Sequence, residues 1–403
     1  MAISLAKYFM GIGAKRLSEV EIKADTSNQH EFNGINEFRE IFGDDKIRFN
    51  GKFIFLSDDE EKTLEENGTL TWYDAREKHL TRTEYRLYYS SNEIIENSSV
   101  GDLVIIARTE VDELLIIVAA AGSTSEKQLL WLFGLAEVQN KFIIKDLSNE
   151  KQELGYAGEY VINSLGIEIE EEAPDYLQQM LSLYGENFPS TSVFSTFARS
   201  TIKDVSPIEE PDNTLVLWMR QEELLFKTLE RRIVQKKLNA GFGEDGIDVE
   251  DFIHFSLSVQ NRRKSRAGYA FENHLSEIFN IHKVRYSNGK VTEMNKKPDF
   301  IFPGIKEYHT PDIDVNLLSL LGLKTTAKDR WRQVLSESAL IKKKHLITLE
   351  PAISKNQTDE MISENLQLVL PKEIYKTYSK EQQSSTIILV EFIDLVRKKQ
   401  MLF

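Results

Sequence analysis

The chain has 403 residues, 41% of them hydrophobic and 28% charged, which is typical of a soluble globular protein and excludes a disordered or fibrous one. It contains no cysteine, which excludes disulfides and thiolate zinc sites, and its seven histidines include no pair at metal-ligand spacing. The net charge of −14 is unlike that of many nucleic-acid-binding proteins, although a basic cleft can lie on an acidic body.

Two expectations follow from this composition. Any bound metal is expected to be a hard cation held by carboxylates, because thiolate ligands are absent. No apolar run approaches the length needed to span a bilayer, and the briefly apolar start lacks a signal-like cleavage region. We therefore expect a cytoplasmic protein.

The first part of the chain is predicted to be mainly β. Two apolar runs, residues 103–107 and 114–120, flank a short polar segment and are expected to form a hairpin. Many short strands with little helix between them favour a barrel or a sandwich, which we place at residues 1–165. The runs of strand composition cover residues 52–56, 70–73, 84–89, 103–107 and 114–120.

An acidic stretch with a proline, residues 167–175, predicts a linker over 166–187, because like charges disfavour compact packing. Beyond it, apolar residues recur at helical spacing from Leu224 to Ile233 and from Phe271 to Phe279. Strands then alternate with helices, which predicts an α/β domain over residues 188–403. The predicted strands are 299–302, 315–323 and 346–349, and the predicted helices begin near Trp331 and at Ile387.

One constellation in this last part suits phosphodiester cleavage, which needs carboxylates for a divalent cation and a positive group near the phosphate. Asp299 begins one predicted strand and Lys324 ends the next, with a loop and a return strand between them. Pro-Asp followed by a distant Lys also occurs by chance. Nucleases of the PD-(D/E)XK type carry an acid two positions before the lysine, where this chain has Gly322.

A second acid is available on the segment after Lys324. If a helix begins near Lys328, Arg330 and Glu337 lie about two turns apart on one face. Such a helix would direct Glu337 to a metal and Lys328, Asp329 and Arg330 to DNA. Glu272, on the preceding predicted helix, is a further acid for the metal site.

Three blocks, residues 261–268, 295–300 and 323–333, closely resemble EcoRII-type restriction endonucleases in order and spacing. The resemblance implies a C-terminal α/β nuclease domain of the PD-(D/E)XK type. It implies that Asp299 and Glu337 bind Mg²⁺, that Lys324 stabilises the attacked phosphate, and that Glu272 supports the metal site. Lys328 and Arg330 would read guanines and Asp329 a cytosine, which agrees with the donor and acceptor groups of these bases.

A basic run heads the predicted helix that carries Glu272. Such runs are usually solvated turns, but cations at a helix N-terminus oppose the helix dipole, and phosphate contact gives a reason for them. The resemblance favours contact with the DNA backbone. It also places Arg220 near the central base pair, although an ordinary position on a helix surface is equally compatible with its surroundings. The run comprises Arg262, Arg263, Lys264 and Arg266.

The N-terminal part carries alternating charges, and Arg82, Glu84 and Arg86 on a strand would project to one side. One interpretation is a solvent-exposed barrel face with cross-strand Arg–Glu pairs. The Thr-Arg-x-Glu-x-Arg pattern also resembles the effector-binding domain of the same family, a β-pseudobarrel related to DNA-binding domains of plant transcription factors. That resemblance implies that loops around His30, together with Arg76, Arg82, Glu84 and Arg86, grip a second copy of the site.

The leading hypothesis is a homodimeric, Mg²⁺-dependent type II endonuclease that cuts double-stranded DNA at a CC(A/T)GG-like site and is activated by a second, effector copy. A palindromic target implies two-fold symmetry, and in-line hydrolysis leaves a 5′-phosphate and a 3′-hydroxyl. Two alternatives remain: a DNA-binding protein of this fold without catalysis, and an enzyme whose cations bind a small phosphate. The Lys-Asp-Arg triplet at 328–330 favours DNA, because it suits base edges.

Overall fold

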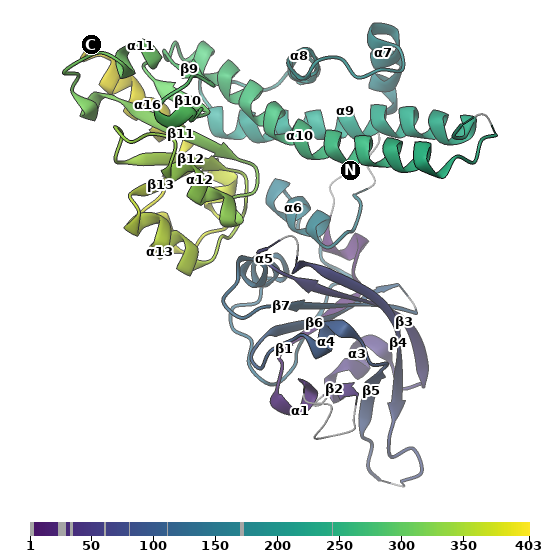
Figure 1. Ribbon diagram of the computed structural model, residues 1–403. Helices are drawn as coiled ribbons and strands as arrows, with labels where there is room; N and C mark the ends of the chain where they lie inside the picture. Colours follow the sequence, from purple (N-terminus) through teal and green to yellow (C-terminus); the bar gives the residue numbers. More distant parts are fainter. Residues whose placement is uncertain are drawn as a thin grey trace. The chain divides into compact units, whose positions relative to one another are not determined.

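The computed structural model divides the chain into two compact units, Met1–Ile167 with Ala352–Asn356, and Glu168–Pro351 with Gln357–Phe403 (Figure 1). The predicted acidic stretch falls partly outside the described residues, at 170–172, and so does the side chain of Asp329. The structure describes residues 4–22, 30–32, 35–59, 62–79, 81–110, 112–169, 173–243 and 245–403, apart from the side chains of Pro174, Met294 and Asp329.

The first unit is built on a curled eight-stranded sheet in the order β2-β5-β4-β3-β7-β6-β1-β8 (Figure 1). Its neighbouring strands are antiparallel except for β3 and β7, which pair in parallel. The predicted strands and the β6–β7 hairpin are confirmed. The strands are β1 (Gly11–Arg16), β2 (Glu31–Phe32), β3 (Ile47–Leu56), β4 (Leu64–Asp74), β5 (Tyr85–Tyr89), β6 (Leu103–Glu110), β7 (Glu113–Ala119) and β8 (Ile143–Asp146).

An aromatic cluster fills the inside of this sheet. Trp72 of β4 is fully buried, stacks on Tyr85 with ring centroids 4.8 Å apart, and meets Phe42 edge-on at 5.2 Å. Burial of such large rings contributes most of the hydrophobic stabilisation of a small β unit. Helices also belong to this unit: α1 (Glu19–Ile22), α3 (Arg39–Phe42), α4 (Glu93–Glu96), α5 (Thr124–Phe133) and α6 (Tyr156–Ser164).

The second unit begins with helices, including two long ones that lie side by side, α9 (Pro211–Ala240) and α10 (Val249–Ile281) (Figure 1). Before them come α7 (Pro174–Tyr184) and α8 (Thr191–Thr201). Much of the segment that the sequence suggested as a linker is thus helical. Met180 of α7 is fully buried in a cluster with residues of α8 and α9, because the apolar face of α7 has a neighbour to pack against.

The rest of this unit is a mixed six-stranded sheet in the order β14-β13-β12-β11-β10-β9. Strands β9 to β11 are antiparallel and β11 to β14 are parallel, with helices between the parallel strands. This is the α/β arrangement that the alternating pattern predicted. The strands are β9 (Ser287–Asn288), β10 (Phe300–Phe302), β11 (Ser319–Lys324), β12 (Lys344–Thr348), β13 (Leu366–Leu370) and β14 (Ile387–Ile388).

Helix α10 joins the long helices to this sheet, since its buried Phe279 meets Phe300 and Phe302 of β10, each at 5.3 Å between ring centroids. Two predicted boundaries were wrong by a few residues. A 3₁₀ turn occupies Val315–Leu317 before β11, and the closing helix starts at Leu389. The remaining helices are α11 (Ile305–Tyr308), α12 (Trp331–Leu335), α13 (Lys355–Ser363), α14 (Lys372–Tyr375), α15 (Lys380–Gln383) and α16 (Leu389–Gln400).

None of the helices in the described ranges combines the length and the apolar character needed to cross a membrane.

Candidate active site

Asp299 and Lys324 are brought together by the pairing of β10 with β11. Asp299 directly precedes β10 and Lys324 is the last residue of β11, and the two strands are antiparallel, with Phe300 opposite Leu321. The backbone N–H of Leu323 donates to Asp299 Oδ2 at 2.6 Å. Burial raises the pKa of Asp299, and the charge of Lys324 opposes this rise. The predicted arrangement of these two residues is therefore present.

Glu337 joins them, but not from a helix as the sequence suggested. The segment forms a 3₁₀ turn at Lys328–Arg330 and then α12, which ends at Leu335. The predicted two-turn helix is wrong because the chain turns out of α12 at Ser336. The N–H of Glu337 bonds back to the Val334 carbonyl at 3.2 Å, and its own carbonyl accepts from Thr292 Oγ1 at 2.7 Å.

The carboxylate of Glu337 lies close enough to that of Asp299 for the two charges to interact. Burial raises the pKa of Glu337 to about 7, and Asp299 adds to the rise. Lys324, Lys344 and Lys296 oppose it. Glu337 Oε2 is buried and has no hydrogen-bond partner. Two like charges in a desolvated place, one with an unbonded oxygen, form a donor set that suits a hard divalent cation.

The site offers two converging carboxylates rather than a larger cage. Among the described side chains there is no group of three or more His, Asp or Glu that could hold a metal ion. Glu272 of α10 accepts from Asn288 Nδ2 at 2.6 Å, and Asn288 pairs with Phe300, the residue after Asp299. Glu272 is therefore linked through Asn288 of β9 to β10, the strand that Asp299 precedes.

The acid missing at position 322 has a steric explanation. A Cβ on Gly322 would lie 2.5 Å from Cγ2 and 2.8 Å from Cγ1 of Val334, because α12 packs directly against β11. Side chains cannot approach so closely without displacement of the helix. An acid at 322 is thus incompatible with this packing, and the second carboxylate reaches the site from beyond the end of α12.

Sequence reasoning missed Lys344, the first residue of β12. It is only 7% exposed, and the rest of its strand is buried as well. Burial lowers the pKa of Lys344, and Glu337 opposes this effect. A lysine at the head of an apolar strand is itself an unusual pattern, and that signal could have been found.

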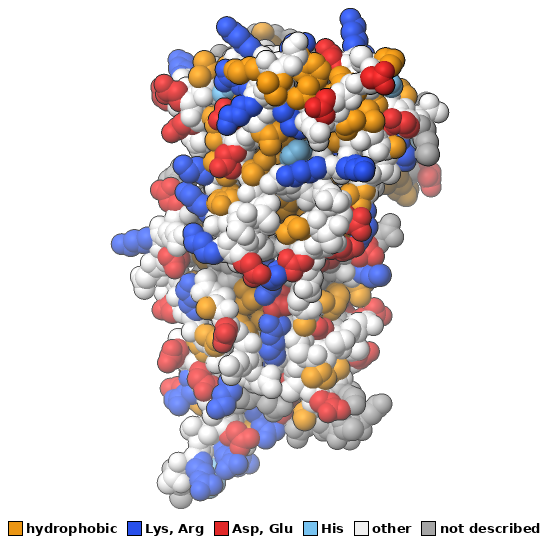
Figure 2. Space-filling model, turned by 90° about the vertical axis from the view of Figure 1, so that its left-hand side faces the viewer, with side chains coloured by type: hydrophobic (Ala, Val, Ile, Leu, Met, Phe, Trp, Pro, Cys, Tyr) orange, Lys and Arg blue, Asp and Glu red, His pale blue; other side chains and the backbone are white. Residues whose placement is uncertain are grey.

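The basic run lies in the middle of α10 and not at its start, so the argument from the helix dipole was wrong. The helix begins three turns earlier, where Asp248 caps it by accepting from the N–H of Asp251 at 3.0 Å. Arg263 pairs with Glu230 at 2.6 Å, and Arg266 pairs with Glu223 while stacking on an aromatic ring. In the space-filling view, basic and acidic side chains are interspersed over the face shown (Figure 2).

The remaining predicted DNA-contacting residues of this unit differ in exposure. Lys264 and Arg330 are exposed, and Arg262 lies over the Phe188 ring at 4.7 Å. Lys328 is half-buried, and so is Arg220 on α9. The exposed members are the ones most accessible to a polyanion.

In the first unit, most of the predicted effector-binding charges pair with one another. Arg86 bonds to Glu84 and to Glu31, each at 2.8 Å, and Arg76 pairs with Glu84 from the other side. Tyr73 donates to Glu31 at 2.6 Å. Arg86 and Arg76 lower the pKa of Glu84. This is the network of Arg–Glu pairs that the sequence allowed as an alternative.

The other two residues predicted to contact effector DNA are Arg82 and His30. Arg82 is exposed and precedes β5, so the predicted alternation from Arg82 to Arg86 on one strand was only partly right. His30 lies beside Tyr88 and Tyr89, with ring centroids 6.5 and 5.8 Å apart.

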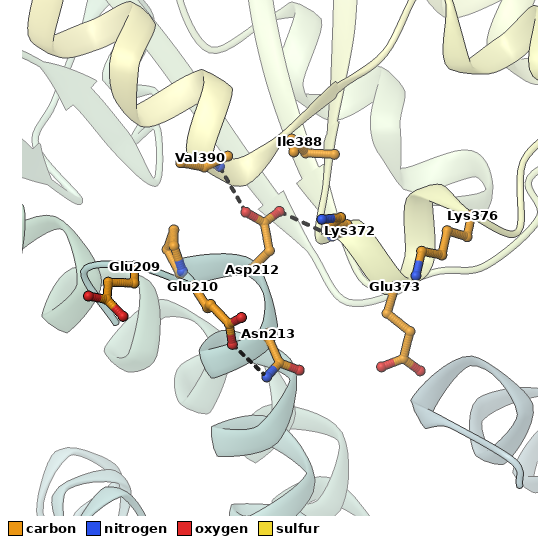
Figure 3. Close-up of a pocket in the computed structure, with 10 residues that line it drawn as sticks. Glu209, Glu210, Asp212, Asn213, Lys372, Glu373, Lys376, Ile388 and Val390 are labelled. Carbon is orange, nitrogen blue, oxygen red and sulfur yellow. Dashed lines mark hydrogen bonds between the residues drawn. The ribbon is translucent and has the colours of Figure 1, made fainter. Parts of the chain in front are cut away.

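A pocket at the start of α9 holds another buried carboxylate (Figure 3). Asp212 accepts from the backbone N–H groups of Lys372, Leu389 and Val390 at 3.1, 2.9 and 3.0 Å. Three donors satisfy this carboxylate, in contrast to Glu337. Asp212 therefore fastens α9 to the C-terminal strands and helix, and its role is structural.

Comparisons with known proteins find similarity to restriction endonucleases. Residues 226–393 match the EcoRII C-terminal family. The chain is 39% identical over 207 residues to the type II restriction enzyme EcoRII of Escherichia coli, and the match covers 51% of this chain and 50% of that protein. The chain thus spans about half the length of the curated relative that it matches. Residues 226–393 are thus similar to the EcoRII C-terminal family, which confirms the resemblance seen in the sequence over this region.

Two solved structures are partly similar. The restriction endonuclease PspGI–substrate DNA complex gives a TM-score of 0.44 at 16% identity, covering 54% of this chain and 95% of that one. Metal-depleted Ecl18kI in complex with uncleaved, modified DNA gives a TM-score of 0.47 at 16% identity, covering 58% and 86%.

Proposed function

We propose that the protein is a type II restriction endonuclease that hydrolyses double-stranded DNA at a specific sequence. The observation that carries this proposal is the convergence of Asp299, Lys324 and Glu337, with Glu337 at a pKa of about 7. In this proposal the second unit is a nuclease domain of the PD-(D/E)XK type, and the curled sheet of the first is a β-pseudobarrel that binds effector DNA.

Asp299 and Glu337 would hold Mg²⁺, with Glu272 supporting the site through Asn288. When bound, the cation neutralises charge on the phosphate and makes water a better nucleophile. Lys324, beside Asp299, would stabilise the negative charge that develops on the attacked phosphate. Lys344 favours the ionised form of Glu337, which is the form that binds a cation.

Sequence recognition would come from the Lys328–Arg330 turn, with a CC(A/T)GG-like site as target. Cationic side chains donate to guanine, and a carboxylate accepts from cytosine. Arg262 and Lys264 would contact phosphates directly, whereas Arg263 and Arg266 would exchange their carboxylate partners for phosphate. Arg220 would lie near the central base pair.

A homodimer is part of the proposal, since a palindromic target calls for two-fold symmetry. Exposed apolar side chains on the first turns of α10 support it. Val249, Ile253 and Leu257 recur every four residues and are 65%, 42% and 51% exposed. A stripe of this kind on a helix usually meets a partner, and a second copy would cover it.

Activation by an effector copy would involve the first unit. Arg76, Arg82, Glu84, Arg86 and the loop at His30 would contact that DNA. The Arg–Glu network supports this role, because a DNA phosphate could compete with Glu84 for the guanidinium groups of Arg76 and Arg86.

The test is cleavage of a plasmid that carries several CC(A/T)GG sites, with Mg²⁺ or with EDTA. Asp299→Ala should abolish cleavage, and Asp394→Ala, an exposed aspartate of α16, is the matched control and should cleave normally. Fragments that map to those sites would support both the nuclease activity and the recognition sequence. Fragments that map elsewhere would support the nuclease activity but contradict the proposed recognition sequence. Absence of cleavage, even with an oligonucleotide effector, would indicate a catalytically silent DNA-binding protein.

A further inference from the structure

The turn proposed to read bases lacks a cap of its own. Lys328–Arg330 forms a 3₁₀ turn that continues into α12, and the residue before it, Ala327, has no side chain that could accept a hydrogen bond. The first N–H groups of a helix need acceptors from elsewhere. The Ala327 carbonyl already serves the N–H groups of Arg330 and Trp331, at 2.7 and 3.1 Å.

Glu350 supplies the missing acceptor from a distant part of the chain. One carboxylate oxygen, Oε2, accepts from the N–H of Ala327 at 2.6 Å and from the N–H of Lys328 at 3.0 Å. Glu350 lies two residues after β12, the strand that pairs with β11. The turn is thus fastened to the neighbouring strand of the sheet as well as to its own.

Glu350 is itself held on both sides and is fully buried. Its N–H bonds to Thr348 Oγ1 at 3.2 Å, and its carbonyl accepts from the Tyr378 hydroxyl at 2.8 Å. Ala327 and Trp331, at the two ends of the turn, are also fully buried. A buried carboxylate with fixed neighbours gives the turn a rigid point of attachment.

The backbone at Lys328 shows why that attachment is needed. Its φ is +23°, a conformation that residues with a side chain adopt only where the surrounding structure holds them. Base readout requires side chains held to within a fraction of an ångström. We propose that Glu350 is a positioning residue for sequence discrimination, which fixes the Lys328–Arg330 turn through Ala327 and Lys328. This inference rests on the proposed function of the turn.

The test is equilibrium binding of the full chain, with Ca²⁺ in place of Mg²⁺, to a duplex containing CC(A/T)GG and to a scrambled duplex. We expect Glu350→Ala to reduce the ratio of the two affinities at least tenfold, while affinity for the scrambled duplex changes less than threefold, because phosphate contacts remain. Glu350→Gln should change the ratio less than threefold, since an amide oxygen still accepts both N–H groups.

Asp212→Ala is the matched control, because it also removes a buried carboxylate that accepts backbone N–H groups. It should leave the ratio unchanged even if stability falls. If Glu350→Ala does not fold, Glu350→Asp, which withdraws the carboxylate by one methylene, should reduce the ratio at least threefold. A folded Ala or Asp variant that keeps the ratio of the wild type overturns the inference. A ratio near one in the wild type overturns the proposed function, and the inference with it.

Discussion

Two groups of charged residues, one in each unit, are arranged in opposite ways. In the first unit, Arg76, Glu84 and Arg86 alternate in sign and neutralise one another, and the pKa of Glu84 is lowered by its two arginines. In the second, Asp299 and Glu337 are half-buried with like charges together, and the pKa of each is raised. The charges of the first arrangement neutralise one another. The repulsion between the carboxylates of the second is removed only when a cation or protons are added.

This difference separates a structural network from a reactive site better than the number of charges does. Alternating charges on a strand look like a binding surface in the sequence, yet most of these side chains already have partners. The carboxylates of the second unit are far apart in the sequence and converge only in the folded chain. Repulsion between half-buried carboxylates that raises their pKa is the stronger indication of function.

The largest effect is expected from Glu337→Gln, which removes both the repulsion and a proposed metal ligand. Cleavage should fall by about a thousandfold or more, because a group that binds the catalytic cation is lost. Cleavage assays with Mg²⁺ check this, with Glu360→Gln as control, since Glu360 forms an exposed pair with Arg332. Cleavage at the normal rate by the Gln variant would show that Glu337 is not part of the active site.

The same variant should be more stable than the wild type at pH 8 without divalent cations. The pKa of Glu337 is raised to about 7 by folding, so the native state binds its proton more tightly than the unfolded state does. The wild type therefore loses stability as pH rises from about 4.3 to about 7, by up to roughly 3 kcal/mol. Urea unfolding at pH 5 and pH 8 measures this, and an equal stability of the two proteins at pH 8 would contradict it.

The buried site should also depend on the packing around Gly322. Gly322→Ala is expected to destabilise the protein by about 1–3 kcal/mol, because the new Cβ meets Val334 at 2.5 Å. Val334→Ala removes the two methyl groups concerned, so the double variant should lose less than the sum of the single ones. A double-mutant cycle by urea unfolding checks this, and strict additivity would show that Val334 is not the obstacle.

Metal affinity should rise with pH by about tenfold between pH 6 and pH 8, as Glu337 ionises through its pKa of about 7. Calorimetric titration of the wild type with Mg²⁺ measures this change. Glu337→Gln should bind weakly and with a flat pH profile. A flat profile in the wild type would mean that Glu337 does not bind the cation.

The smallest effects are expected in the first unit. Arg82→Gln should reduce the slope of log affinity against log salt by about 0.9 for non-specific DNA, the value for one phosphate contact. Arg86→Gln should reduce it less, because Glu84 and Glu31 already neutralise that guanidinium. Binding at several salt concentrations would show this, and the reverse order would mean that DNA displaces Glu84 and Glu31 completely.

Many helices and strands could be predicted from the sequence because the patterns that indicate them are local. Runs of strand composition located β3 to β7 of the first unit, and helical periods located parts of α9 and α10. The alternation of strands with helices gave the α/β order of the second unit, whereas β1, β2 and β8 were not predicted. The positions of Asp299 and Lys324 at strand ends followed from the same patterns, and antiparallel pairing of adjacent strands then brought them together. Local periodicity determines local structure, and short connections determine which neighbours meet.

Other features depended on packing between distant segments. Nothing local to Gly322 shows that Val334 fills the space above it, nothing local to Glu337 shows that α12 ends before it, and nothing local to Glu350 shows that it caps the Lys328–Arg330 turn. The start of α10 was misplaced because its first turns carry exposed apolar residues with no buried face to give the usual pattern. Such contacts join residues far apart in the chain, so only the tertiary structure decides them.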